Sequence, residues 1–140
     1  MVMACFLPGY VRVAVDEIRR TGAANVGGIM RAVGETDFEC AVARAMTSPL
    51  GIGAAPFYLG GPAGPASSVY LGVFRREVLY RLGGYDEHFA RAQDWELNHR
   101  IRAAGETVWF TPSWLSRIGP GRACARWPGS SSGPASGAAR

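Results

Sequence analysis

Residues 85–105, YDEHFARAQDWELNHRIRAAG, place four carboxylates close together: Asp86, Glu87, Asp94 and Glu96. A carboxylate within hydrogen-bonding reach of a hydroxyl group can accept its proton as that hydroxyl attacks, which is general base catalysis. The same residue types also occur where no chemistry takes place, as helix caps and on solvated helix faces. Both interpretations stay open until the elements that position these carboxylates are considered.

The elements around these carboxylates are a turn and a helix. The helix is predicted over residues 94–104, and Gly105 closes it. Asp86 and Glu87 follow a Gly-Gly pair, so turn chemistry explains them more simply than catalysis does. On the local pattern alone, Asp94 is an N-cap residue, as any Asp before such a helix can be.

Side-chain pairing separates Glu96 from Asp94. Glu96 lies about 200° around the helix axis from Asp94, so the two carboxylates cannot share a face. The predicted partner of Glu96 is Arg100 at i+4, while Leu97 and Ile101 form the core side of the helix. Glu96 is therefore assigned to helix pairing.

Histidine and tryptophan side chains in the same region have structural explanations too. His99 follows Glu96 in a Glu-x-x-His pattern, and His88 lies in the turn, but one such pair lacks the partners that a metal needs. Surface pairing is therefore the favoured interpretation of both histidines. Trp95 and Trp109 could stack on a sugar or a base, although core packing is favoured.

Helical patterns also occur in the first third of the chain. One helix is predicted over residues 9–21 and is closed by Gly22. A second helix, within residues 35–48, opens with a capping box of Thr36 and Glu39. Its apolar residues form one face: Phe38, Ala41, Val42, Ala45 and Met46.

Strands and loops complete the pattern. The predicted strands are residues 23–30, 68–75 and 106–112, the last stopped by Pro112. A short helix ends at the Gly83-Gly84 pair, and the uncharged, Gly- and Pro-rich residues 49–67 are typical of a functional or mobile loop. This alternation predicts an α/β layer fold.

Composition bounds the class of protein. The 140 residues suffice for one domain with a core, and 48% are hydrophobic. The net charge of +4 comes from scattered arginines without a basic run, which disfavours nucleic-acid binding. Three well-separated cysteines support neither a zinc ribbon nor a disulfide framework. Because no apolar run approaches the roughly 18 residues of a membrane span, we expect a cytoplasmic location.

Four motifs follow one another in the second half of the chain. They are Gly72 to Arg75, Gly83 to Glu87, Gln93 to Arg100, and Val108 to Pro112. In this order and spacing they resemble the second half of the catalytic domain of family 2 glycosyltransferases, which have the GT-A fold. The closest branch resembles the succinoglycan-type exopolysaccharide transferases, and the resemblance covers roughly residues 9–118.

This resemblance implies a reaction, a set of partners and a general base. Family members move a sugar from a nucleotide-diphosphate donor to a glycan or lipid-linked acceptor, usually with inversion, and some act at the inner face of the plasma membrane. The family's general base maps onto Asp94, while the acid that precedes it in the family is Gln93 here. The resemblance further implies substrate-binding roles for Gly27, Gly28, Gly72, Arg75 and Trp95.

The sequence lacks one part of the family's machinery. Family members hold Mg²⁺ or Mn²⁺ and the donor diphosphate with an Asp-x-Asp motif, and no Asp-x-Asp occurs here. We therefore expect no cofactor in this chain and a partial GT-A fold, truncated on its N-terminal side and inactive alone. The alternative is a non-enzymatic remnant or a small binding module with a retained α/β fold.

These expectations divide the chain into two segments. Residues 1–118 are interpreted as the acceptor and base half of a glycosyltransferase domain. Residues 119–140 contain no acidic residue and no periodic apolar face, which predicts a disordered tail. Its abundance of Gly, Ala, Ser, Pro and Arg follows from GC-rich codons, which raises the hypothesis that this tail is translated out of frame.

Overall fold

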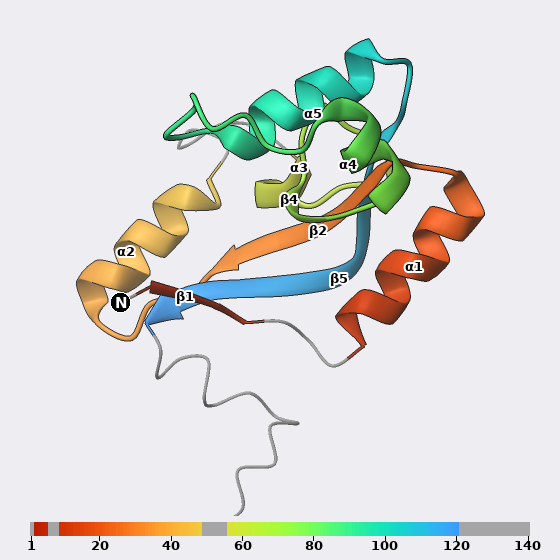
Figure 1. The fold of residues 1–140 in the computed structure, drawn as a ribbon. Helices are drawn as coiled ribbons and strands as arrows, with labels where there is room; N and C mark the ends of the chain where they lie inside the picture. Colours follow the sequence, from red (N-terminus) through yellow and green to blue (C-terminus); the bar gives the residue numbers. More distant parts are fainter. Residues whose placement is uncertain (1, 6–8, 49–55, 121–140) are drawn as a thin grey trace, which may run out of the picture.

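A mixed β-sheet forms the centre of the fold (Figure 1). The computed structural model describes residues 2–5, 9–48 and 56–120. Along the sheet the strand order is β1-β5-β2-β4, and β3 also pairs with β5. The strands are β1 (Val2–Cys5), β2 (Asn25–Ala32), β3 (Gly64–Pro65), β4 (Tyr70–Phe74) and β5 (Val108–Pro120). Only β2 and β5 are parallel among these pairs, because β1, β3 and β4 each run antiparallel to their partner.

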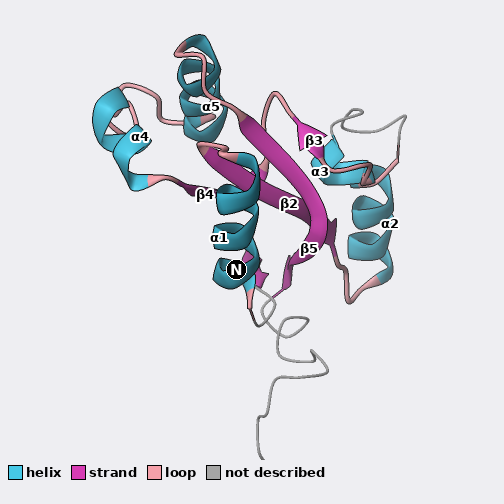
Figure 2. Ribbon diagram, turned by 90° about the vertical axis from the view of Figure 1, so that its right-hand side faces the viewer, coloured by secondary structure: helices cyan, strands magenta, loops and turns pink. Residues whose placement is uncertain are grey.

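Helices surround this sheet, and the α/β prediction is confirmed (Figure 2). They are α1 (Tyr10–Thr21), α2 (Asp37–Met46), α3 (Pro56–Leu59), α4 (Arg76–Leu82) and α5 (Gln93–Ala103). The four longer helices agree with the sequence prediction, including the Gly22 C-cap of α1 and the capping box of α2. The sequence did not predict α3, β1 or β3. Of the predicted loop, residues 49–55 lie outside the described residues.

Each face of the sheet packs against different helices, because side chains alternate along a strand. On one face Val108 and Phe110 of β5 join a buried cluster with Leu97 and Ile101 of α5. On the other face a second cluster includes Val26 of β2 and residues of α1. The helix that carries Asp94 is therefore fixed to the sheet through its apolar side.

The last strand does not stop at Pro112 as the sequence predicted. β5 pairs Phe110 with Gly27, and after an irregularity it pairs Leu115 with Ile29. Pro112 lies within this irregularity, where the missing N–H removes no ladder hydrogen bond. β5 consequently extends to Pro120. The rest of the predicted tail, residues 121–140, lies outside the described residues.

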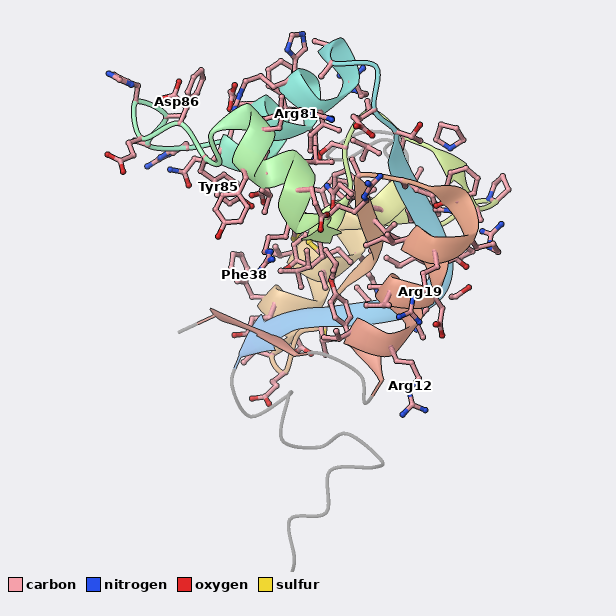
Figure 3. All side chains as sticks on the ribbon, turned by 45° about the vertical axis from the view of Figure 1, so that its right-hand side comes forward. Arg12, Arg19, Phe38, Arg81, Tyr85 and Asp86 are labelled. Carbon is pink, nitrogen blue, oxygen red and sulfur yellow. The ribbon has the colours of Figure 1, made fainter. Side chains whose placement is uncertain are left out.

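The apolar face predicted for α2 is present in the sequence but is not buried. No residue of α2 is buried against the described part of the chain, and Phe38 is 78% exposed. Figure 3 shows the Phe38 side chain projecting outward from the helix. The amphipathic pattern and the capping box thus determined the helix, while this face has no partner among the described residues.

None of the helices within the described ranges combines the length and the apolar character needed to cross a membrane.

Candidate functional site

Asp94 lies in the first turn of α5 and is exposed. The helix begins at Gln93, and its N-cap is Ala92 in a left-handed conformation with φ of 60° and no side-chain cap. The interpretation of Asp94 as an N-cap is therefore wrong. The carboxylate is free of that capping role, and a negative charge in a first turn is favoured by the helix dipole.

Two phenols approach the Asp94 carboxylate from other elements. Tyr85, which follows the Gly83-Gly84 turn, hydrogen-bonds to Asp94. Partial burial raises the pKa of Tyr85, which is 45% exposed, to about 12, with further contributions from the Asp94 charge and this hydrogen bond. Tyr70, at the start of β4, also has a raised pKa, because of burial first, then the neighbouring Tyr58, then Asp94. The candidate base thus influences two nearby phenols.

The Tyr85 phenol gives a direct test of this contact. We expect Asp94→Asn to lower the pKa of Tyr85 from about 12 toward the ordinary tyrosine value near 10. The carboxylate charge disfavours the phenolate and its hydrogen bond stabilises the protonated phenol, whereas burial, the largest cause, remains in the variant. NMR of ¹³C-labelled tyrosine rings measures this titration, and Tyr85→Phe identifies the signal. An unchanged Tyr85 titration in Asp94→Asn would show that the two side chains are not in contact.

The same shift has a consequence for stability. The pKa of Tyr85 is higher in the folded chain than the ordinary value near 10 expected in the unfolded chain. The stabilising contribution of this phenol is therefore fully present below about pH 10 and is lost as the pH rises toward 12.

Arg100 fixes the turn that carries Tyr85 onto α5. Its guanidinium donates to the carbonyl oxygens of Leu82 and Gly84 at 2.6 and 2.7 Å. It also donates to both carboxylate oxygens of Glu96, at 2.5 and 2.7 Å, which confirms the predicted i+4 pair. The hydrogen bond from Arg100 lowers the pKa of Glu96. Glu96 and Arg100 are thus structural residues that hold the turn against the helix.

The turn residues behave as the sequence predicted. Asp86 accepts hydrogen bonds from the backbone N–H and from the ring Nδ1 of His88, each at 2.9 Å. The backbone hydrogen bond is the largest cause of the lowered pKa of Asp86. Such a carboxylate closes a turn over its own backbone, so the interpretation as turn chemistry is confirmed for Asp86.

A buried polar network supports α5 from beneath. The Asn25 amide of β2 donates to the Asn98 side chain of α5 at 2.6 Å, and Asn98 donates to the Ser68 hydroxyl at 3.1 Å. A Cβ on Gly72 would overlap the Asn25 side-chain amide. Gly72 therefore makes room for the amide that anchors α5, a role in positioning the helix.

The other predicted glycines, Gly27 and Gly28, lie in β2 where this strand pairs with β4. A Cβ on Gly27 would lie 2.5 Å from the Val69 side chain and 2.8 Å from the Tyr70 carbonyl oxygen. Gly27 is thus required by the close approach of two backbones. Gly28 is buried and is the register partner of Tyr70, one of the two phenols near Asp94.

Trp95 and Arg75, the remaining predicted substrate-binding residues, lie in different places. Trp95 is 58% exposed next to Asp94, and its ring stacks on His99 with centroids 6.0 Å apart. The core-packing interpretation of Trp95 is therefore wrong, and an exposed aromatic face stands beside the candidate base. Arg75 instead donates to the Gly22 carbonyl at the end of α1, at 3.3 Å.

Trp109 contrasts with Trp95, because it packs beside the α1 cluster under the Arg20 guanidinium, which lies 5.6 Å from the ring centroid. Asp94 and Trp95 therefore lie side by side at the start of α5. Gly28 is related to them only indirectly, because it pairs with Tyr70, whose pKa Asp94 influences. The sequence did not predict Tyr70 and Tyr85 as site residues. The aromatic residue after the Gly-Gly pair was the signal that could have indicated Tyr85.

The described residues do not fit a divalent metal site. No group of three His, Cys, Asp or Glu side chains that could hold a metal ion occurs in the described ranges. The carboxylate nearest to Asp94 in the helix, Glu96, is taken by Arg100. No step of the chemistry proposed below is therefore routed through a metal held by these residues.

Comparison with known proteins gives one informative match. The chain is similar to a protein of succinoglycan biosynthesis. It is 34% identical over 102 residues to the succinoglycan biosynthesis protein ExoA of Rhizobium meliloti (strain 1021). The match covers 73% of this chain and 31% of ExoA, so the chain spans about a third of that protein's length. No protein-family model and no solved structure matches the chain. The similarity to ExoA supports the resemblance to succinoglycan-type transferases that the four motifs indicate.

Proposed function

We propose that this chain carries the acceptor side of a sugar transferase of exopolysaccharide synthesis, with Asp94 as its general base. The observation that carries the proposal is the exposed Asp94 carboxylate in the first turn of α5, with the Tyr85 phenol close by. The helix beneath it is anchored by buried Leu97 and by the Asn98 network. The similarity to ExoA and the order of the four motifs support the same family of reactions.

The proposed reaction transfers a sugar from a nucleotide-diphosphate donor to an acceptor hydroxyl. The hydroxyl oxygen attacks the anomeric carbon, the bond from that carbon to the diphosphate oxygen breaks, and the diphosphate leaves with the electron pair. Asp94 accepts the hydroxyl proton while the new bond forms. Tyr85 occupies one side of the carboxylate and so orients it. Attack opposite to the leaving group inverts the anomeric configuration.

Exposed aromatic surface beside Asp94 suits a sugar acceptor. The ring of Trp95 offers an apolar face on which the C–H groups of a pyranose can pack, and the stacked His99 restrains it. We infer that Trp95 contacts the acceptor sugar, while Gly27, Gly28 and Gly72 act indirectly by setting the positions of Tyr70 and α5.

The metal ion that neutralises the donor's leaving diphosphate requires an acidic motif that this sequence does not contain. A leaving diphosphate needs a cation or clustered basic side chains to stabilise its charge, and the sequence has no Asp-x-Asp motif. We infer that the donor and its Mg²⁺ or Mn²⁺ are bound by protein outside these 140 residues, at the cytoplasmic face of the membrane. The same missing motif favours a second candidate function, a binding module that keeps the fold without turnover.

A chimera with ExoA separates these two functions. Residues 9–118 replace the matching segment of ExoA in a Rhizobium meliloti strain that lacks its own ExoA, and secreted succinoglycan is measured. We expect the chimera to restore production, which a module without catalytic residues could not do. A chimera that is expressed and folded yet makes no succinoglycan contradicts the transferase proposal.

A binding measurement tests the inferred location of the donor site. The purified 140-residue chain is titrated with a panel of nucleotide sugars, with and without Mn²⁺. We expect no Mn²⁺-dependent binding. Such binding would place a donor site within this chain and overturn that part of the proposal.

A further inference from the structure

A concave site lies between α2, α3 and the end of β2. It is a pocket of about 360 Å³, within the size range of small-molecule sites. Its walls combine the last residues of β2, the last turn of α2, and Tyr58 and Leu59 of α3. The described contacts around Asp94 do not include the residues of β2 or α2 that form these walls.

Two arginines line this pocket without a carboxylate to neutralise them. They are Arg31 at the end of β2 and Arg44 in the last turn of α2, both exposed, and no acidic residue is among the lining residues that the structure describes. Within the described part of the chain, neither arginine forms an ion pair. The pocket therefore carries two full positive charges, which favour an anionic ligand.

The end of α2 does not cancel this charge. The carbonyl end of a helix has a partial negative charge of roughly one half. Here the Thr47 hydroxyl donates to the Ala43 and Arg44 carbonyls at 3.0 and 3.2 Å, and the Thr47 backbone N–H bonds the same two carbonyls. Because those carbonyls already have donors, the two guanidinium groups dominate the field in the pocket.

The position in the fold also fits a ligand site. β2 and β5 are parallel, and their pairing reaches Ala32 and Ile118 near the carboxyl ends of both strands. In open α/β sheets, ligands bind in the crevice outside the carboxyl ends of parallel strands. The wall formed by Ile29, Met30 and Ala32 belongs to that end of β2.

We propose that this pocket binds a phosphate or diphosphate group through Arg31 and Arg44. Two guanidinium groups on one cavity match an anion with several oxygens and more than one negative charge, since each can form paired N–H···O hydrogen bonds. A single carboxylate carries one negative charge and so would neutralise only one of the two guanidinium charges.

The test is a titration of the 140-residue chain with inorganic pyrophosphate. Binding is measured by calorimetry and from the NMR signals of the arginine side chains. We expect saturable binding with shifts at Arg31 and Arg44. Arg31→Ala and Arg44→Ala should each weaken binding about tenfold or more, as expected for loss of a hydrogen bond between charged groups. Circular dichroism checks that each variant is folded, and Arg44→Gln, which keeps the side-chain length, repeats the test.

Arg12→Ala is the matched control, because Arg12 is exposed like Arg31 and Arg44 but lies outside the pocket. Arg12 lies on α1, across the molecule from α2 (Figures 1 and 3), and it does not line the pocket. We expect the affinity of Arg12→Ala for pyrophosphate to stay within about twofold of that of the unchanged chain, since distant surface charges are screened by salt. The proposal is overturned if Arg12→Ala loses as much pyrophosphate affinity as the two pocket variants, or if the pocket variants lose none.

Further ligands define the anion and its source. Glucuronate carries one carboxylate, and binding as tight as that of pyrophosphate would overturn the assignment to phosphate. Glucose 1-phosphate that binds at least as tightly as inorganic phosphate supports a phosphate carried by a sugar substrate. Weaker binding of glucose 1-phosphate than of free phosphate supports a site for the free anion. The pocket and Asp94 are tested separately, because binding here requires no transfer and the chimera measures transfer alone.

Discussion

Asp94→Asn in the ExoA chimera is expected to lower sugar transfer by roughly 10²–10⁴-fold, the usual contribution of a general base. The amide keeps the size of the carboxylate but cannot accept a proton at neutral pH. The Tyr85 phenol can still hydrogen-bond to the side-chain oxygen of the new residue, so the turn and the helix should keep their positions. Succinoglycan production in cells and transfer by the purified chimera both measure the effect.

Asp37→Asn is the matched control for this variant. Asp37 is also an exposed aspartate in the first turn of a helix, but it lies in α2 and no contact joins it to Asp94 in the described residues. Its loss should leave transfer unchanged and should lower stability by at most about 1 kcal/mol through the helix dipole. Full activity in Asp94→Asn would remove Asp94 from the chemistry, and equal losses in both variants would indicate a general effect of charge.

Local sequence signals predicted most of the helices correctly. The capping box of Thr36 and Glu39 and the glycine after Thr21 fix the ends of α2 and α1 through hydrogen bonds within a few residues. These contacts are local, so the sequence contains the whole signal. The same holds for Glu96 and Arg100, which are one helical turn apart.

Elements that depend on distant partners were not predictable in this way. β1 and the two-residue β3 are strands only because each pairs with β5. The end of β5 was missed because Pro112 falls at an irregularity in the pairing with β2, and nothing local shows that the strand resumes. A proline that stops one strand and a proline within a bulge look alike in sequence.

The candidate site also combines features that local sequence predicts with features that depend on distant contacts. Asp94 followed from the motif order, whereas its hydrogen bond to Tyr85 depends on a turn held by Arg100. Trp95 was expected in the core because aromatic side chains usually are buried. The helix begins at Gln93, so Trp95 faces solvent while Leu97 and Ile101 face the sheet.

Leu97→Ala should produce the largest loss of stability that bears on the site. Leu97 is completely buried between α5 and the sheet, in the cluster that includes Phe110. Removing its buried methyl groups loses transfer free energy and leaves a cavity, which together cost about 2–5 kcal/mol. Urea unfolding followed by circular dichroism measures the change in the free energy of unfolding.

Val11→Ala is the control, because it also shortens an aliphatic side chain within a helix but at a position that is 64% exposed. Its change in the free energy of unfolding should stay within about 0.5 kcal/mol. If Leu97→Ala costs no more than this control, α5 is not held by the core that the structure shows. If the loss is large, the cluster around Leu97 anchors the helix that carries Asp94, and transfer by the chimera should fall in Leu97→Ala even though Asp94 itself is intact.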